Sequence, residues 1–242
     1  VDDFEAVDRN AIRSLGSEER GAPIAAMCVR AAALAHVVPC VGYVVEEYPK
    51  GGTLNADHVR PIILRNSAAL KSAGIVPMKL MSVAKNMGDH QVCTFPDGTR
   101  LRGMDARGGS IPGRKVVILG DTSDPSAIAD IAHGADVLVH EATNAFLPFF
   151  EKDKTAKQVQ YDTISHGHST PEMAGRFAKR IGAKMLILNH FSPRYNGDDS
   201  LRAVEVMLEI EQLARKAAGL GLQQVIAAWD FMSVPIKSQK GL

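Results

Sequence analysis

The stretch Lys115-Val116-Val117-Ile118-Leu119-Gly120-Asp121-Thr122 decides the fold class, because an aliphatic run of strand length ends in a glycine and a carboxylate. Two later stretches repeat this arrangement: residues 136–141 end in His140-Glu141, and residues 184–190 end in His190. Segments with a helical pattern separate these short runs, and such alternation is typical of α/β layered folds. Sites in these folds form at the carboxyl ends of the strands, so we expect the acids and histidines to meet there.

The flanking patterns predict the other elements of this fold. We expect strands over residues 22–35, 41–46, 115–119, 137–140, 184–189, 224–228 and 231–236, and helices over residues 125–133, 171–181 and 201–218. Ser169 and Glu172 have the spacing of a capping box at the start of the second helix. Pro171 suits its first turn, and Gly182 can end it.

Residues 49–112 differ from the rest, because glycine, proline and basic residues recur there. We interpret this segment as an inserted, flexible arm, with a helix near residues 56–70 and a hairpin at Pro96-Asp97-Gly98. Its basic side chains could contact phosphates or simply form a solvated face. They are Lys50, Arg60, Arg65, Lys71, Lys79 and Lys85.

Length and composition restrict the class of protein. The 242 residues are 45% hydrophobic, which is enough for a sizeable core, and a net charge of +1 requires any nucleic acid to bind a local basic patch. Three widely spaced cysteines fit neither a disulfide framework nor a cysteine-based zinc site, and they indicate a reducing, intracellular compartment: cytosol, nucleus or an organelle. No apolar run approaches the ~20 residues of a membrane span. The chain lacks an initiator Met, so we expect it to begin inside a longer protein.

Three residues are candidate metal ligands by type and position. The two carboxylate oxygens of Asp121 could bridge two metals, although a turn aspartate capping the next helix would look the same. His190 leaves a buried strand and is either a ligand or a core histidine. His36 lies in an apolar stretch, and taken alone it fits a buried structural residue.

His168 and Glu141 are candidates for proton transfer. A histidine beside a carboxylate could protonate a leaving oxygen, whereas the alternative for His168 is an accessory to the helix cap. Asp230 could orient a histidine or occupy a turn between strands. Arg194 is suited to binding a phosphate.

As an ordered series, these segments resemble ribonuclease Z, the tRNA 3′-processing endonuclease family of the metallo-β-lactamase superfamily. The similarity extends from His36 nearly to the C-terminus. The strings that carry it are Val38-Pro39-Cys40-Val41-Gly42-Tyr43, Pro112-Gly113-Arg114-Lys115, Gly120-Asp121-Thr122, residues 135–143 (ADVLVHEAT), residues 166–171 (HGHSTP), residues 188–195 (LNHFSPRY) and residues 228–231 (AWDF).

The resemblance implies a role for each candidate. His36 and His190 would each bind one of two zinc ions, and Asp121 would bridge them. Glu141 and His168 would form the proton-transfer pair beside the metals. Asp230 and Thr122 would support the metal shell, and we assign Arg194, Ser169 and Thr170 to substrate binding.

The resemblance also implies an architecture and partners. The fold would be the superfamily's αβ/βα sandwich, represented over residues 1–242 mainly by its C-terminal half and therefore N-terminally incomplete. The arm at residues 49–112 would correspond to the exosite that clamps precursor tRNA held in the other subunit of a homodimer. No membrane partner is implied.

Two departures from the family pattern are visible. The family arm carries a Pro-Pro-Gly-Pro-like string, whereas residues 74–79 keep only Pro77. The H-x-H-x-D-H motif, which supplies four family ligands, is not found in the 242 residues. The three remaining ligands are too few for two metals, so this chain could hold at most one.

Three functions are consistent with these observations. The first is a zinc-dependent endoribonuclease that removes 3′ trailers from precursor tRNA. The second keeps the fold but hydrolyses a small phosphodiester or thioester, which the altered arm string favours. The third is a metal-free homologue that binds RNA or a protein, which the missing motif would favour in a complete chain.

Overall fold

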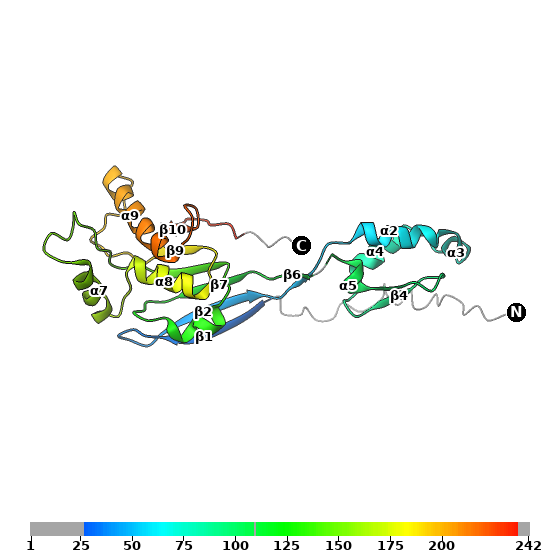
Figure 1. Ribbon diagram of the computed structural model, residues 1–242, viewed down its shortest axis with the longest axis horizontal. Coiled ribbons are helices and arrows are strands. Elements are labelled where there is room, and N and C mark those ends of the chain that lie inside the picture. The colour runs from blue at the N-terminus through cyan, green and yellow to red at the C-terminus, as the bar shows by residue number, and fades with distance from the viewer. Residues whose placement is uncertain (1–26, 109, 237–242) are drawn as a thin grey trace. The chain divides into compact units, whose positions relative to one another are not determined.

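The computed structural model describes residues 27–108 and 110–236, which divide into two compact units (Figure 1). We call residues 27–47 and 114–236 the sheet domain, and residues 48–113 the arm. Each unit has its own cluster of buried apolar side chains. Each is therefore described by itself.

A six-stranded mixed sheet forms the centre of the sheet domain. The strand order is β1-β2-β7-β8-β9-β10, with antiparallel pairing from β1 to β7 and parallel pairing from β7 to β10. The parallel part reflects the strand–helix alternation of the sequence. The strands are β1 (Met27–Leu34), β2 (Cys40–Glu47), β7 (Lys115–Leu119), β8 (Val137–Glu141), β9 (Leu186–Asn189) and β10 (Val225–Ala227).

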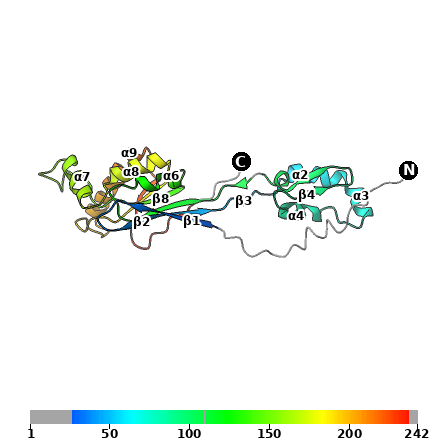
Figure 2. The same ribbon diagram turned by 90° about the horizontal axis from the view of Figure 1, so that it is seen from below.

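The core lies on one face of this sheet. In Figure 2, α6, α8 and α9 lie on the same side of the strands. Strand residues that face the helices are fully buried, as Val44, Val117 and Leu138 show. The helical elements of this domain are the 3-10 turn η1 (Ser126–Ile128), α6 (Ala129–Ala132), α7 (Ala156–Ser165), α8 (Pro171–Ile181) and α9 (Leu201–Ala218).

The opposite face of the sheet carries exposed apolar side chains. Tyr43 pairs with Ile118 in the β2–β7 register, and these side chains are 46% and 43% exposed. Val29 on β1 is 58% exposed. Since opposed residues of paired strands share a face, these side chains form one apolar surface. We call this surface the open face.

The arm combines short helices with two small ribbons around its own core. Its buried side chains include Val59, Ile63, Leu70 and Leu101. The elements are β3 (Lys50–Gly51), α2 (Ala56–Arg65), α3 (Ser67–Ser72), α4 (Lys79–Asn86), β4 (Val92–Thr94), β5 (Arg100–Arg102), α5 (Gly103–Ala106) and β6 (Ser110–Ile111).

The structure confirms the predicted hairpin in the arm and corrects the predicted helix. Strands β4 and β5 pair around Asp97, whose carboxylate accepts a hydrogen bond from the Thr99 amide at 2.9 Å. The helix expected near residues 56–70 is two helices that meet at Asn66. The Asn66 side chain donates to the Ile62 carbonyl and accepts from the Asp97 amide, so it joins the helix end to the hairpin.

In the sheet domain, most predicted elements are confirmed and three details differ. The helix cap is displaced by one residue, because Thr170 rather than Ser169 accepts the capping hydrogen bond, from the Met173 amide, and the predicted capping box is not formed. Residues 231–236 form no strand. Helix α7 was not predicted, although Thr155 and Gln158 form a capping box at its start. The part of the first predicted strand at residues 22–26 lies outside the described residues.

Within residues 27–108 and 110–236, every helix is too short or too polar to cross a lipid bilayer.

Candidate metal and proton-transfer site

The strand order brings the candidate residues to one edge of the sheet. Strands β7, β8 and β9 are parallel, so Asp121, Glu141 and His190 all lie at their carboxyl ends. Strand β2 runs antiparallel to β7, which places the turn between β1 and β2, with His36, at this same edge. The segment before α8 adds His168, which contacts Glu141.

These side chains form two overlapping groups with ligand atoms in metal-binding range. His36, Asp121 and His168 offer one set of atoms within 4.8 Å of one another, and Glu141, His168 and His190 offer a second. The Nε2 atom of His190 lies 3.5 Å from Oδ2 of Asp121, which links the two groups. His168 belongs to both groups, whereas the sequence assigned it to proton transfer alone.

Hydrogen bonds fix the orientation of the His36 and His190 rings. Nδ1 of His36 lies 2.8 Å from the Gly167 carbonyl, and a carbonyl can only accept, so this nitrogen carries the proton. Nδ1 of His190 lies 2.9 Å from the Thr143 hydroxyl, which itself donates to Glu141. Both arrangements leave Nε2 as a free lone pair, which is the usual tautomer of a histidine metal ligand.

Glu141 is a buried acceptor at the centre of this network. Its side chain is 1% exposed, and Oε1 accepts a hydrogen bond from the Thr122 amide at 2.6 Å. Oε2 accepts from the Thr143 hydroxyl, and both oxygens lie 3.2 Å from Nδ1 of His168. The carboxylate therefore orients His168, whose side chain is 20% exposed.

Two backbone positions at the site have left-handed conformations. Gly167 has φ of +83°, and a Cβ there would lie 2.5 Å from Nδ1 of His36, so only glycine allows this close approach. His190 has φ of 53°, which is uncommon for a residue with a side chain and is found where the surrounding structure imposes it. In addition, His36 is partly exposed, unlike the buried core histidine that its apolar neighbours suggested.

Thr122, Ser169 and Thr170 serve the fold of the site. The Thr122 hydroxyl donates to the Ala35 carbonyl at 3.1 Å, and the Ser169 hydroxyl donates to the Thr122 carbonyl at 2.6 Å. Ser169 is 0% exposed and Thr170 is 3% exposed. Both side chains are therefore buried, and a contact of Ser169 and Thr170 with substrate remains a prediction.

Arg194 and Asp230 lie apart from the two ligand groups. The Arg194 guanidinium pairs with Glu151 and donates to the Ala145 carbonyl at 3.0 Å, so it holds two loops of the domain together. Asp230 lies in an exposed turn, and among the described residues its carboxylate has no hydrogen bond or ion pair. The roles expected for Arg194 and Asp230 remain predictions.

His140 is a buried histidine that the candidate set did not include. Its Nδ1 donates to the Glu141 carbonyl at 2.8 Å, and its Nε2 has no partner among the described residues. Burial lowers the pKa of His140 below the ordinary histidine value, so the ring is neutral. Its ring packs against Phe177, and His140 fixes the end of β8 beside Glu141.

The donor set fits a divalent metal ion. Imidazole nitrogens and carboxylate oxygens are the ligands that hydrolytic zinc takes, and the described groups offer both within reach of one another. The hydrogen bonds that Nδ1 of His36 and Nδ1 of His190 make with protein oxygens resemble those that orient metal-ligating histidines.

Comparison with known proteins gives relatives of about twice the length of this chain. Ribonuclease BN of Escherichia coli O139:H28 is 36% identical over 168 residues, which are 69% of this chain and 47% of the relative. Ribonuclease Z of Brevibacillus brevis is 36% identical over 205 residues, which are 85% of this chain and 54% of the relative. The chain thus spans about half the length of the curated relatives it matches.

Solved structures give weaker likenesses. The short form of human tRNase Z is 24% identical with a TM-score of 0.43, covering 88% of this chain and 45% of that chain. The metallo-β-lactamase fold protein YhfI from Bacillus subtilis is 15% identical with a TM-score of 0.41, covering 86% and 48%. No protein-family model matches the chain. On these sequence relatives, matched over about half of their length, the chain belongs to the ribonuclease Z/BN family.

Proposed function

We propose that the full-length protein is a zinc-dependent endoribonuclease that removes 3′ trailers from precursor tRNA. The observation that carries the proposal is the buried Glu141 carboxylate holding His168 between His36 and His190. The ring centroids of His36 and His190 lie 5.0 and 5.2 Å from that of His168. Similarity to proteins named ribonuclease Z and ribonuclease BN supports RNA as the substrate.

In this proposal, His168 transfers the proton. Nδ1 is engaged with Glu141, so Nε2 is the ring nitrogen that would deliver a proton to the departing ribose oxygen. The Glu141 carboxylate stabilises the protonated ring and is itself held by the Thr122 amide. His36, Asp121 and His190 would hold the zinc, with Asp121 able to share its two oxygens. Bound zinc would activate water and neutralise charge on the phosphate.

The arm is the proposed contact to the body of the tRNA, reaching from one subunit of a homodimer to substrate on the other. Four of its basic side chains, Arg60, Lys71, Lys79 and Lys85, are exposed. Arg65 is engaged with Asp97 at 2.6 Å and is a structural residue of the arm. The four exposed cations could bind the phosphate backbone.

Metal content and cleavage, measured together on the full-length protein, test the division of roles. We expect His168→Ala to lower kcat on precursor tRNA by about 10²–10⁴-fold with zinc content unchanged, as for loss of a general acid. His190→Ala should lower both zinc content and cleavage. His166→Ala is the matched control, because this exposed histidine two residues from His168 bonds only to neighbours on α7.

Each result has a definite consequence. Normal cleavage by His168→Ala overturns the proton-transfer assignment, and loss of zinc from this variant makes His168 a ligand. A wild-type protein without zinc favours the metal-free homologue. Cleavage of a small bis-aryl phosphodiester but not of precursor tRNA favours the small-molecule hydrolase, for which the altered arm string at residues 74–79 is the supporting observation.

A further inference from the structure

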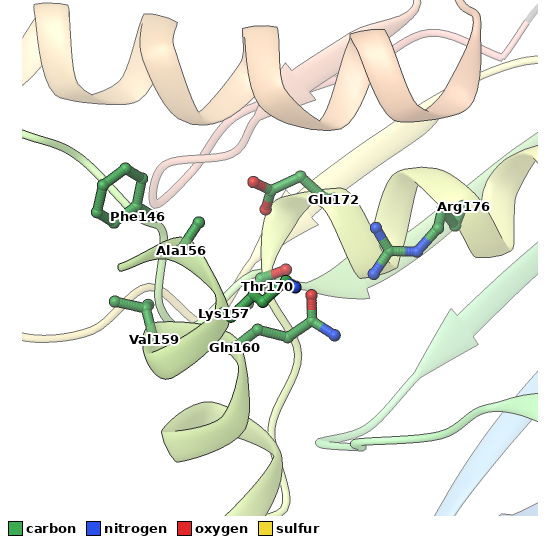
Figure 3. Close-up of a pocket in the computed structure, with 8 residues that line it drawn as sticks. All are labelled: Phe146, Ala156, Lys157, Val159, Gln160, Thr170, Glu172 and Arg176. Carbon is green, nitrogen blue, oxygen red and sulfur yellow. The ribbon is translucent and has the colours of Figure 1, made fainter. Parts of the chain in front are cut away.

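A pocket of about 120 Å³ lies between α7 and α8, beside the segment that carries His168 (Figure 3). Helix α7 contributes Lys157 and Gln160 to its lining, and α8 contributes Glu172 and Arg176. Thr170, two residues after His168, forms part of the wall. The pocket therefore adjoins the candidate site but shares no ligand or proton-transfer residue with it.

The pocket is lined by polar groups that the fold does not use. Among the described residues, the side chains of Lys157, Gln160 and Arg176 have no hydrogen bond or ion pair. Figure 3 shows the Arg176 guanidinium and the Gln160 amide pointing toward one another across the pocket. Two cations and an amide donor directed at one small space form a binding site for an anion.

Glu172 is the one acid in the lining, and its position accounts for its presence. It lies in the first turn of α8, where a carboxylate interacts favourably with the helix dipole. In Figure 3 its carboxylate points toward Phe146 and away from Arg176. Glu172 and Arg176 lie four positions apart on α8 but make no salt bridge, so the charge of Arg176 remains available.

The volume of the pocket limits the size of the ligand that it can hold. The volume of about 120 Å³ lies well below the ~300–1,000 Å³ of sites for whole drug-sized ligands. A space of this size suits a single phosphate group better than a complete nucleotide. We propose that the pocket binds one backbone phosphate of the RNA strand near the scissile phosphodiester, an inference that rests on the proposed function.

The test pairs a variant of the pocket with a matched control in the full-length, zinc-loaded protein. Lys157→Gln/Arg176→Gln removes both pocket cations. Lys152→Gln/Lys179→Gln removes two exposed cations outside the pocket, one before α7 and one on α8. We expect the pocket variant to lower kcat/KM on precursor tRNA by about tenfold, as for loss of charged hydrogen bonds, and the control to change it little.

Two further readouts identify the lost contact. Cleavage of a small bis-aryl phosphodiester should be unchanged in the pocket variant, because this probe has no second phosphate. Precursor tRNAs with one neutral methylphosphonate near the cleavage site locate the phosphate. One position should weaken cleavage by the wild type by about tenfold and leave the pocket variant unaffected, because its contact is already lost.

The outcomes separate the two proposals. If the wild type cleaves precursor tRNA but the pocket variant matches the control, the phosphate pocket is overturned and the proposed function stands. The same holds if every methylphosphonate affects the wild type and the pocket variant equally. If the wild type does not cleave precursor tRNA, the proposed function fails, and this inference fails with it.

Discussion

At the scale of single residues, the site depends on contacts between positions far apart in sequence. Gly167 accepts the Nδ1 hydrogen bond of His36 across 131 positions, and Ser169 donates to the Thr122 carbonyl across 47. These bonds determine which ring nitrogen of His36 is free and where the His168 segment lies. Residues that bind no metal therefore orient the candidate metal ligands of this site.

Gly167→Ala tests whether Gly167 orients the His36 ring for metal binding. The added Cβ would meet the His36 ring at 2.5 Å, so we expect zinc content to fall and cleavage of precursor tRNA to drop at least tenfold. Metal analysis and kcat/KM of the full-length protein measure this. Gly134→Ala is the matched control: its φ of +72° imposes comparable backbone strain, but nothing lies within 4 Å of the new Cβ. Equal effects of the two variants would attribute the loss to strain alone.

Several residue assignments followed from the sequence because residue type limits chemistry. Asp121, Glu141, His168 and His190 were singled out as acids and histidines at strand or helix ends, and the structure brings them together. Ser169, Thr170 and Arg194 were less predictable. A hydroxyl or guanidinium serves substrate and fold equally well, and only the three-dimensional neighbours distinguish these uses.

At the scale of elements, α8 shows how far local signals reach. Its bounds at Pro171 and Ile181 were predicted from the proline at its start and from Gly182, which ends it with φ of 65°. Its cap was misassigned by one residue, because the Ser169 hydroxyl donates a hydrogen bond to the Thr122 carbonyl and does not cap the helix. Helix α7 was missed since its exposed Tyr161 and Ile164 weaken the amphipathic pattern.

The packing of α8 on α9 gives an element-scale prediction. A Cβ at Gly175 would lie 2.3 Å from the Ala214 carbonyl oxygen on α9. Gly175→Ala gains about 1 kcal/mol of helix propensity but forces the two backbones apart at a cost of about 1–3 kcal/mol. We expect net destabilisation by urea unfolding of the full-length protein, whereas Lys179→Ala on the exposed face of α8 should stay within about 0.5 kcal/mol. A stabilised Gly175→Ala variant would contradict this packing.

At the scale of the whole molecule, the open face is the surface of the sheet domain that leaves apolar side chains exposed. Val29, Tyr43 and Ile118 expose a contiguous apolar surface, while α6, α8 and α9 lie on the other face. Exposed apolar patches of this kind mark contact surfaces. We expect this face to pack against another layer in the full-length protein, as in the sandwich that the family resemblance implies.

Substitution by lysine tests whether the open face is covered. Ile118 and Val204 are 43% and 44% exposed, the first on the open face and the second on α9. We expect Ile118→Lys to destabilise the full-length protein by about 2–4 kcal/mol, because a packed face would bury the charge, and Val204→Lys to have little effect. Unfolding by urea measures both. Equal, small effects would show that the open face remains in solvent.

The sequence by itself determined most of the strands and helices in the sheet domain, with α7 and residues 231–236 as the exceptions, and the residue types of the site. Both follow from local chemistry: apolar period, glycine and proline at boundaries, and the limited set of side chains that bind metals or move protons. Tertiary structure alone decided that His168 belongs to both ligand groups, that Ser169 and Arg194 donate to backbone carbonyls, and that a pocket lined by two cations lies between α7 and α8. These properties arise from pairing between segments distant along the chain, and no local pattern encodes which neighbour a side chain will meet.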